Sequence, residues 1–251
     1  MTDRVPSSLS PGIHVLLSIV LPVVGALILT ALVARTLRID TNDQGQISVV
    51  LAGIALASWY IGWRWYGLPE LGLRAGRPLY AGIGFATLGW IAFLLVRFFT
   101  VEVSAYGVED GGRSFVFILL FEAFCVQIWT FGFFFRAVVD WQGPLTAAVA
   151  SGLLFAATAL IFFQEFFILS VSSVLFFTVW GLFYGIIRLR TGSFLGTTII
   201  QALQSWTAWQ VMVPVYPVDS TELRNLYLIT SALYILFIWR LWPKKEEDYR
   251  I

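Results

Sequence analysis

The chain has 251 residues, of which 59% are hydrophobic and 12% are charged, and its mean hydropathy is +0.82. Soluble domains are about 45–50% apolar with about 25% charged residues, so this composition excludes a water-soluble globule and indicates an integral membrane protein. The net charge of +1 excludes the strongly basic surface that nucleic-acid binding requires.

The histidine and cysteine content excludes several kinds of metal site. His14 and Cys125 are the only residues of their types. A single cysteine cannot form an intrachain disulfide or a zinc site of the cysteine type. A zinc protease of the H-E-x-x-H type needs two histidines on one helix face, and this chain has one histidine. The G-x-S-x-G motif of α/β-hydrolases is also not present. We therefore expect no metal cofactor and neither of these two hydrolase classes.

Eight apolar segments are long enough to cross a hydrocarbon core of about 30 Å. We predict that all are helical and that they form one transmembrane domain over residues 1–251. In chain order they are Ile13–Val33, Ile47–Trp65, Leu79–Phe99, Phe115–Phe135, Leu145–Phe163, Phe166–Ile187, Phe194–Val213 and Asn225–Leu241. The first is too long for the core of a signal peptide and lacks a convincing cleavage site, so we retain it as a span.

The arrangement of positive charge predicts the orientation of the chain. With the N-terminus in the cytoplasm, eleven of the sixteen Lys and Arg residues lie on the cytoplasmic side and five on the outer side. We therefore predict that both termini lie in the cytoplasm. The predicted location is a bacterial cytoplasmic membrane. The fifth and sixth segments are separated only by Gln164 and Glu165, which predicts a tight helical hairpin with an external turn.

Two ionisable residues of the fourth segment are candidate functional residues. Glu122 lies within the apolar run LLFEAFCVQ. An ionisable side chain inside a span costs at least a few kcal/mol, so it marks a functional position by default. The alternative for Glu122 is a protonated carboxyl that forms a hydrogen bond to a neighbouring helix. Arg136 ends the same segment, where an arginine can also extend towards lipid headgroups.

The seventh segment carries a polar stripe. Thr197, Gln201, Gln204 and Ser205 follow one another at i, i+4, i+7 and i+8, which places them on one helical face. Ala208 continues this face with a small side chain. Glutamine side chains inside a membrane need partners, so we expect this face to point into the bundle. Hydrogen bonds between helices and contacts to a ligand both remain open as its role.

Three motifs follow one another in the second half of the chain. They are FGFFFRA at residues 131–137, a helix with Phe155 in GLLFAATAL, and the segment RTGSFLGTTIIQALQSW at residues 190–206. Their order resembles the CPBP family, the CAAX-processing and bacteriocin-processing membrane proteases, which are also called Abi proteins. The resemblance covers about Glu122–Trp206 within a CPBP-like core of about 115–213. It implies an all-α bundle of about eight transmembrane helices.

The same resemblance identifies the positions of the family's active site. The family pattern has E-E-x-x-x-R, then F-x-x-x-H, then H-x-x-x-N. The six matched positions in this chain are, in that order, Phe131, Gly132, Arg136, Ala159, Gln201 and Ser205. The family's site is thought to hold a metal ion through glutamate and histidine, whereas Phe, Gly and Ala offer no side-chain donor and Gln and Ser are weak ligands. We therefore predict a pseudoenzyme with no catalytic residue.

The predicted function is that of a scaffold, assembly factor or accessory subunit of a larger membrane complex. A degenerate cavity of the ancestral site would bind a lipid, a prenyl chain, a pigment or a partner's transmembrane helix. The candidate binding residues are Glu122, Arg136, Gln201, Gln204 and Ser205. The expected partners are the bilayer and other membrane proteins, and not nucleic acid.

Two other functions stay open at this stage. The first is a residual peptidase of the CAAX or bacteriocin-processing type, with Glu122 or Glu165 as the general base. The second is a small-molecule carrier in which Glu122 and the stripe of the seventh segment line a path. The absence of a visible internal repeat disfavours the carrier.

Overall fold

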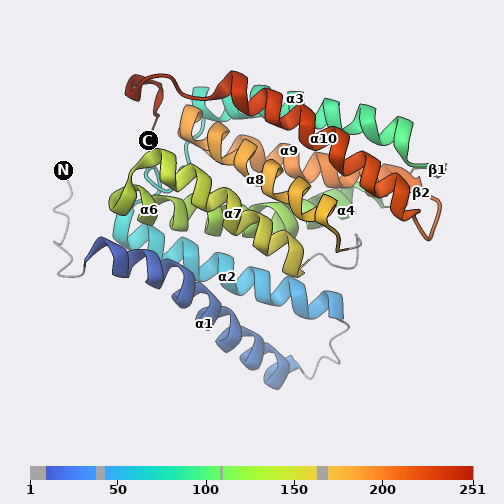
Figure 1. The fold of residues 1–251 in the computed structure, drawn as a ribbon. Helices are drawn as coiled ribbons and strands as arrows, with labels where there is room; N and C mark the ends of the chain where they lie inside the picture. The colour runs from blue at the N-terminus through green and yellow to red at the C-terminus, as the bar shows by residue number, and fades with distance from the viewer. Residues whose placement is uncertain (1–9, 38–42, 108–109, 163–168, 251) are drawn as a thin grey trace.

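The computed structural model describes residues 10–37, 43–107, 110–162 and 169–250, and this part of the chain is predominantly helical. The all-α membrane fold is therefore confirmed. The longer helices are α1 (Pro11–Leu37), α2 (Asp43–Tyr66), α3 (Arg77–Thr100), α7 (Pro144–Phe162), α8 (Val171–Thr191), α9 (Leu195–Ser205) and α10 (Ser220–Leu241). Figure 1 shows α1 at one edge of the bundle and α3 with α10 at the opposite edge. The start of α1 and the end of α10 lie at the same end.

The fourth predicted span is one continuous helical run with two π-helical segments. It consists of α4 (Gly111–Phe117), η1 (Ile118–Phe124), α5 (Cys125–Gln127), η2 (Ile128–Phe134) and α6 (Phe135–Gln142), of which η1 and η2 are π-helical. A third π-helical segment, η4 (Trp206–Val211), continues α9. Such segments are rare and occur frequently at functional sites. Here η1 and η2 contain predicted site residues, and η4 extends α9, which contains further predicted site residues.

Six helical runs of the described chain are long and apolar enough to cross a membrane. They are Pro11–Thr36, Gln46–Tyr66, Arg77–Thr100, Gly111–Gln142, Pro144–Phe162 and Val171–Thr191, and they correspond to the first six predicted segments. The seventh predicted segment is the run α9 and η4, which ends where the strand β2 (Met212–Pro214) begins. The eighth is α10.

Capping residues explain where α8 and α10 begin. The sixth segment was predicted from Phe166, but α8 begins at Val171, because the Ser170 side chain accepts the backbone N–H of Ser173 as an N-cap. Asp219 caps α10 in the same way through the N–H of Thr221, at 2.7 Å. The predicted hairpin turn at Gln164 and Glu165 lies outside the described residues.

A small two-stranded antiparallel sheet that the sequence did not predict joins the ends of α3 and η4. The strand β1 (Val103–Tyr106) pairs with β2, with Ala105 opposite Val213. Arg97 of α3 is fully buried beneath it and donates hydrogen bonds to the carbonyl oxygens of Val101 (2.8 Å) and Met212 (3.0 Å). The guanidinium therefore holds the two-stranded sheet on the bundle.

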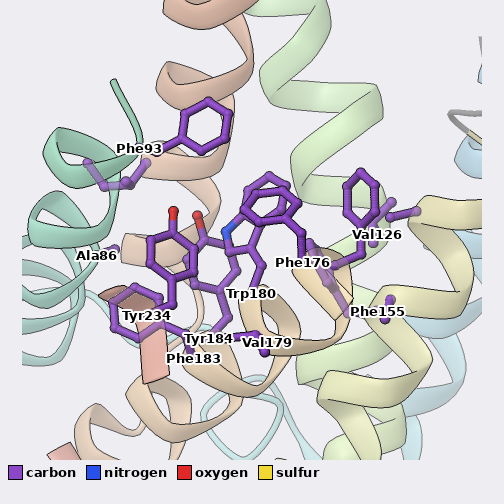
Figure 2. Close-up of a cluster of buried hydrophobic side chains, with 14 of the residues drawn as sticks. Ala86, Phe93, Val126, Phe155, Phe176, Val179, Trp180, Phe183, Tyr184 and Tyr234 are labelled. Atoms are coloured by element: carbon purple, nitrogen blue, oxygen red, sulfur yellow. The ribbon is translucent and has the colours of Figure 1, made fainter. Parts of the chain in front are cut away.

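The backbones of α7 and α8 approach each other closely, and both helices line the site described below. Gly152 faces Gly181, and Ala148 faces Gly185, so that a Cβ atom at Gly181 would overlap the carbonyl of Gly152. Small residues allow helix backbones to approach closely in a membrane. This contact places α8 in the middle of the bundle, and Figure 2 shows that its Phe176 and Trp180 belong to the buried aromatic cluster.

The residues after α10 fold back onto the end of α8. The backbone N–H of Arg250 donates to the carbonyl oxygen of Leu189 (2.9 Å), and the side chains of Asp248 and Arg190 form an ion pair at 3.1 Å. Asp248 also accepts the backbone N–H of Lys244 (2.9 Å). This hydrogen bond is the main cause that lowers the pKa of Asp248 below its ordinary value.

Candidate functional site

A cavity of about 330 Å³ lies within the bundle, at the end opposite the start of α1. It is lined by residues of α2, α3, α4, η1, α5, α7, α8, α9, η4 and α10. Its polar lining residues are Ser48, Ser114, Glu122, Gln201, Gln204, Ser205 and Gln210. Its aromatic lining residues are Phe93, Phe117, Phe121, Phe155, Phe162, Phe176, Phe177, Trp180, Trp209 and Tyr227. An apolar pocket with a few convergent polar groups is the usual form of a small-molecule site.

Glu122 is the acidic residue of this cavity. It lies on η1, and its carboxylate accepts a hydrogen bond from the hydroxyl of Ser205 on α9. Its backbone carbonyl accepts the side-chain amide of Gln201 at 3.3 Å. In the described part of the chain, the ion pairs involve Glu70, Asp140 and Asp248 and not Glu122. The cavity thus holds a carboxyl group whose identified side-chain partner is a neutral hydroxyl.

A second hydrogen-bond network ties α9 to the fourth span. Gln127 of α5 donates from Nε2 to Oε1 of Gln201 (2.7 Å), and its own Oε1 accepts the hydroxyl of Thr197 (2.6 Å). Sequence analysis did not select Gln127, although a side-chain amide in the middle of an apolar span indicates a position that faces a neighbouring helix. All three side chains are buried.

Gln204 has a partner on a third helix. The Tyr234 hydroxyl of α10 lies 3.1 Å from Oε1 of Gln204 and 3.2 Å from the carbonyl oxygen of Gly89. Thr197, Gln201, Gln204 and Ala208 are all buried, so the prediction that the stripe points into the bundle is confirmed. Gln201 and Gln204 bond to neighbouring helices and line the cavity as well.

The structure separates the six motif positions into two groups. Ala159, Gln201 and Ser205 line the cavity. Phe131 does not: it is fully buried, with its ring centroid 5.7 Å from that of Phe155 and 6.4 Å from that of Tyr184. Gly132 is also away from the cavity, where an added Cβ would lie 3.3 Å from the ring of Phe194.

The prediction that Arg136 lines the cavity with the glutamines is wrong. Arg136 follows Glu122 by fourteen residues along the same helical run, a separation of roughly 20 Å. Its guanidinium pairs with Asp140 (2.9 Å) and Glu70 (3.4 Å) and lies 5.8 Å from the ring centroid of Tyr66. Its partners therefore belong to the opposite end of the bundle.

Arg188 is a buried charge that sequence analysis missed. It is 1% exposed, donates from Nε to the carbonyl oxygen of Phe131 (3.1 Å) and from Nη2 to that of Glu70 (3.3 Å), and lies 4.8 Å from the ring centroid of Phe135. Its partners lie on the backbone of the first motif and on the loop before α3. Arg188 therefore holds the motif segment in place.

The comparison with protein families identifies this region. Residues 111–207 match the model described as Type II CAAX prenyl endopeptidase Rce1-like. This segment is therefore similar to Rce1-like members of the CPBP family. The match overlaps the motifs between Glu122 and Trp206, so the resemblance inferred from the sequence is confirmed. A search of curated proteins finds no match.

Proposed function

We propose that this Rce1-like protein is a non-catalytic member of its family. It would act by binding within the membrane, as a scaffold, assembly factor or accessory subunit of a larger complex. The single observation that carries the proposal is the composition of the cavity wall at the motif positions. Ala159, Gln201 and Ser205 stand there, where the family pattern has two histidines and an asparagine.

These residues do not fit the metal site that the family implies. A catalytic metal needs several carboxylate or imidazole donors to hold it and to lower the pKa of its bound water. Ala159 has no donor atom, and Gln201 is already engaged by Gln127 through its side-chain oxygen. Phe131 directs a ring against Phe155 where the pattern has a glutamate. This arrangement therefore supports no metal-dependent hydrolytic step.

The retained cavity supports binding as the function. Apolar and aromatic side chains enclose it, and Glu122, Ser205 and Gln210 provide polar contacts. Such a lining suits a lipophilic ligand, a class that includes lipids and pigments, and no metal is part of the proposal. We also propose a bacterial cytoplasmic membrane as the location. The charge distribution supports an orientation with both termini in the cytoplasm.

The test is purification from native membranes with mild detergent, followed by mass spectrometry of the proteins, lipids and pigments that co-elute. We expect a membrane-protein partner in a stoichiometric amount. In parallel, the purified protein is incubated with a prenylated CAAX peptide, and we expect no cleavage above the rate without protein. Recovery as a lone species, or peptide cleavage, would contradict the proposal.

A residual peptidase is the second candidate, because Glu122 lines the cavity. The other acid considered for this role, Glu165, lies outside the described residues. If Glu122 were a general base, cleavage of the prenylated peptide would be detectable and would disappear in Glu122→Gln. The matched control is Glu247→Gln, which changes an exposed carboxylate in the C-terminal tail.

A further inference from the structure

The charge of Glu122 is not balanced by a basic side chain in the described part of the chain. Arg74, Arg136 and Arg190 pair with other acids. Arg97, which stacks 5.3 Å from the ring centroid of the cavity residue Trp209, donates to backbone carbonyls instead. A carboxylate within a membrane is costly unless a positive charge or several donors stabilise it. A ligand that enters the cavity can supply that charge.

The neutral polar groups beside Glu122 are largely committed to the protein. The side-chain oxygen of Gln201 accepts from Gln127 and its nitrogen donates to the backbone of Glu122. The side-chain oxygen of Gln204 is within hydrogen-bond distance of the Tyr234 hydroxyl. The hydroxyl of Ser205 donates to the Glu122 carboxylate. The carboxylate is therefore the strongest acceptor that the cavity offers to a ligand.

Aromatic faces form the other wall of the cavity. The rings of Phe176 and Tyr227 are stacked with centroids 4.9 Å apart, and Trp180 lies 5.4 Å from Phe176 and 5.5 Å from Phe155. All four side chains line the cavity, and Figure 2 shows Phe155, Phe176 and Trp180 gathered in one cluster. Aromatic faces attract organic cations, most strongly where water is excluded.

The volume limits the size of the occupant. About 330 Å³ is at the lower end of the range for small-molecule sites, which is about 300–1,000 Å³. A partner's transmembrane helix is about 10 Å across and does not fit into this space. The ligand must therefore be one small molecule with an apolar body.

We propose that the cavity binds a small lipophilic organic cation, an amine or quaternary ammonium compound. Its positive group pairs with the Glu122 carboxylate, and its apolar body packs against Phe155, Phe176 and Trp180. This inference rests on the proposed binding function and names its ligand class.

The experiment measures the binding of three probes to the full chain in nanodiscs of phosphatidylcholine. The probes are octyltrimethylammonium, its uncharged tert-butyl isostere and octyl sulfate, and empty nanodiscs are subtracted as background. We expect the cation to bind at least tenfold more tightly than the isostere, and the sulfate not to bind. Glu122→Gln is expected to remove the preference for the cation and to leave the affinity for the isostere unchanged.

Two matched variants separate the site from general effects. Glu247→Gln removes an exposed carboxylate and is expected to keep the tenfold preference, whereas Trp180→Leu is expected to weaken binding of the cation more than that of the isostere. Equal affinities for cation and isostere, an unchanged preference in Glu122→Gln, or no binding of any probe would each overturn the proposed ligand class. Peptide cleavage would overturn the proposed function instead, so the two failures are distinguishable.

Discussion

Gln127 and Gln201 join the fourth span to α9 through a buried hydrogen bond of 2.7 Å between Nε2 of the first and Oε1 of the second. The Gln201 position is the one at which the family pattern has a histidine. The amide therefore acts as a connection between helices at a place where the pattern has a potential metal ligand. Its other hydrogen bond goes to the backbone of Glu122, so the same side chain also supports the cavity wall.

Replacing Gln127 tests this connection. Gln127→Leu removes the hydrogen bond to the Gln201 side-chain oxygen and one of the two acceptors of the Thr197 hydroxyl. We expect the free energy of unfolding to fall by about 1 kcal/mol, the usual size of such bonds in membranes. Unfolding in SDS measures the change. The double variant Gln127→Leu/Gln201→Leu should recover part of the loss, because fewer polar groups are then left unpaired. Full stability of the single variant would show that the network contributes nothing.

Arg188 is expected to be essential for the first motif segment. Arg188→Met removes two hydrogen bonds from a buried guanidinium to the carbonyls of Phe131 and Glu70, and we expect a loss of about 2–4 kcal/mol. Arg190→Met is the matched control two residues later, where a partly exposed ion pair with Asp248 contributes less than about 1 kcal/mol. Equal losses in the two variants would refute the special role of Arg188. Thermal unfolding in detergent provides both values.

The glycine contact between α7 and α8 predicts a strong dependence on side-chain size. In Gly181→Ala the new Cβ would overlap the carbonyl of Gly152, so the helices must separate, and we expect a cost of about 1–3 kcal/mol. Gly84→Ala adds the same methyl group on α3 where no atom lies within 4 Å, and it should be neutral or slightly stabilising. The melting temperatures of the Gly181→Ala and Gly84→Ala variants test this prediction. A difference near zero between them would contradict close packing of α7 against α8.

The attachment of the C-terminal tail should depend on the charge of Asp248. Its pKa is lowered in the folded protein, mainly by the backbone N–H of Lys244, so its contribution is present above the ordinary value of 3.8 and is lost as the pH falls through the lower folded value. Asp248→Asn removes the charge at neutral pH. We expect faster proteolysis of the tail in this variant at pH 7, with Glu247→Asn as the control. Equal cleavage rates would mean that the ion pair with Arg190 does not hold the tail.

The sequence predicted the helices and one face of the site because both depend on periodicity. The stripe from Thr197 to Ala208 could be placed inward, since unpaired amides are excluded from lipid. The motif order indicated a resemblance to the same family that residues 111–207 match. The start of α8 was placed five residues too early because Phe166 and its neighbours are apolar, whereas the cap at Ser170 decides where the helix begins.

Contacts between distant segments could not be predicted. Arg136 matches the family pattern, which suggested that it lies with the other motif positions, but its separation along the helix and its acidic neighbours Glu70 and Asp140 place it elsewhere. Arg188 was one of several basic residues near a helix end, and nothing local marked it as buried. The sheet of β1 and β2 pairs residues more than a hundred positions apart, so no local pattern indicates it.

The π-helical form of η1 has a consequence for the direction of its side chains. In an α-helix, residues five apart differ by about 140° around the axis, so the side chains of Glu122 and Gln127 would point towards different neighbouring helices. The wider turn of a π-helix, with its i to i+5 bonding, brings such residues towards the same side. Both residues accordingly reach α9, one through Ser205 and the other through Thr197. Deleting one residue between Ile118 and Phe124 would restore α-helical geometry in this segment and turn the Glu122 side chain away from Ser205.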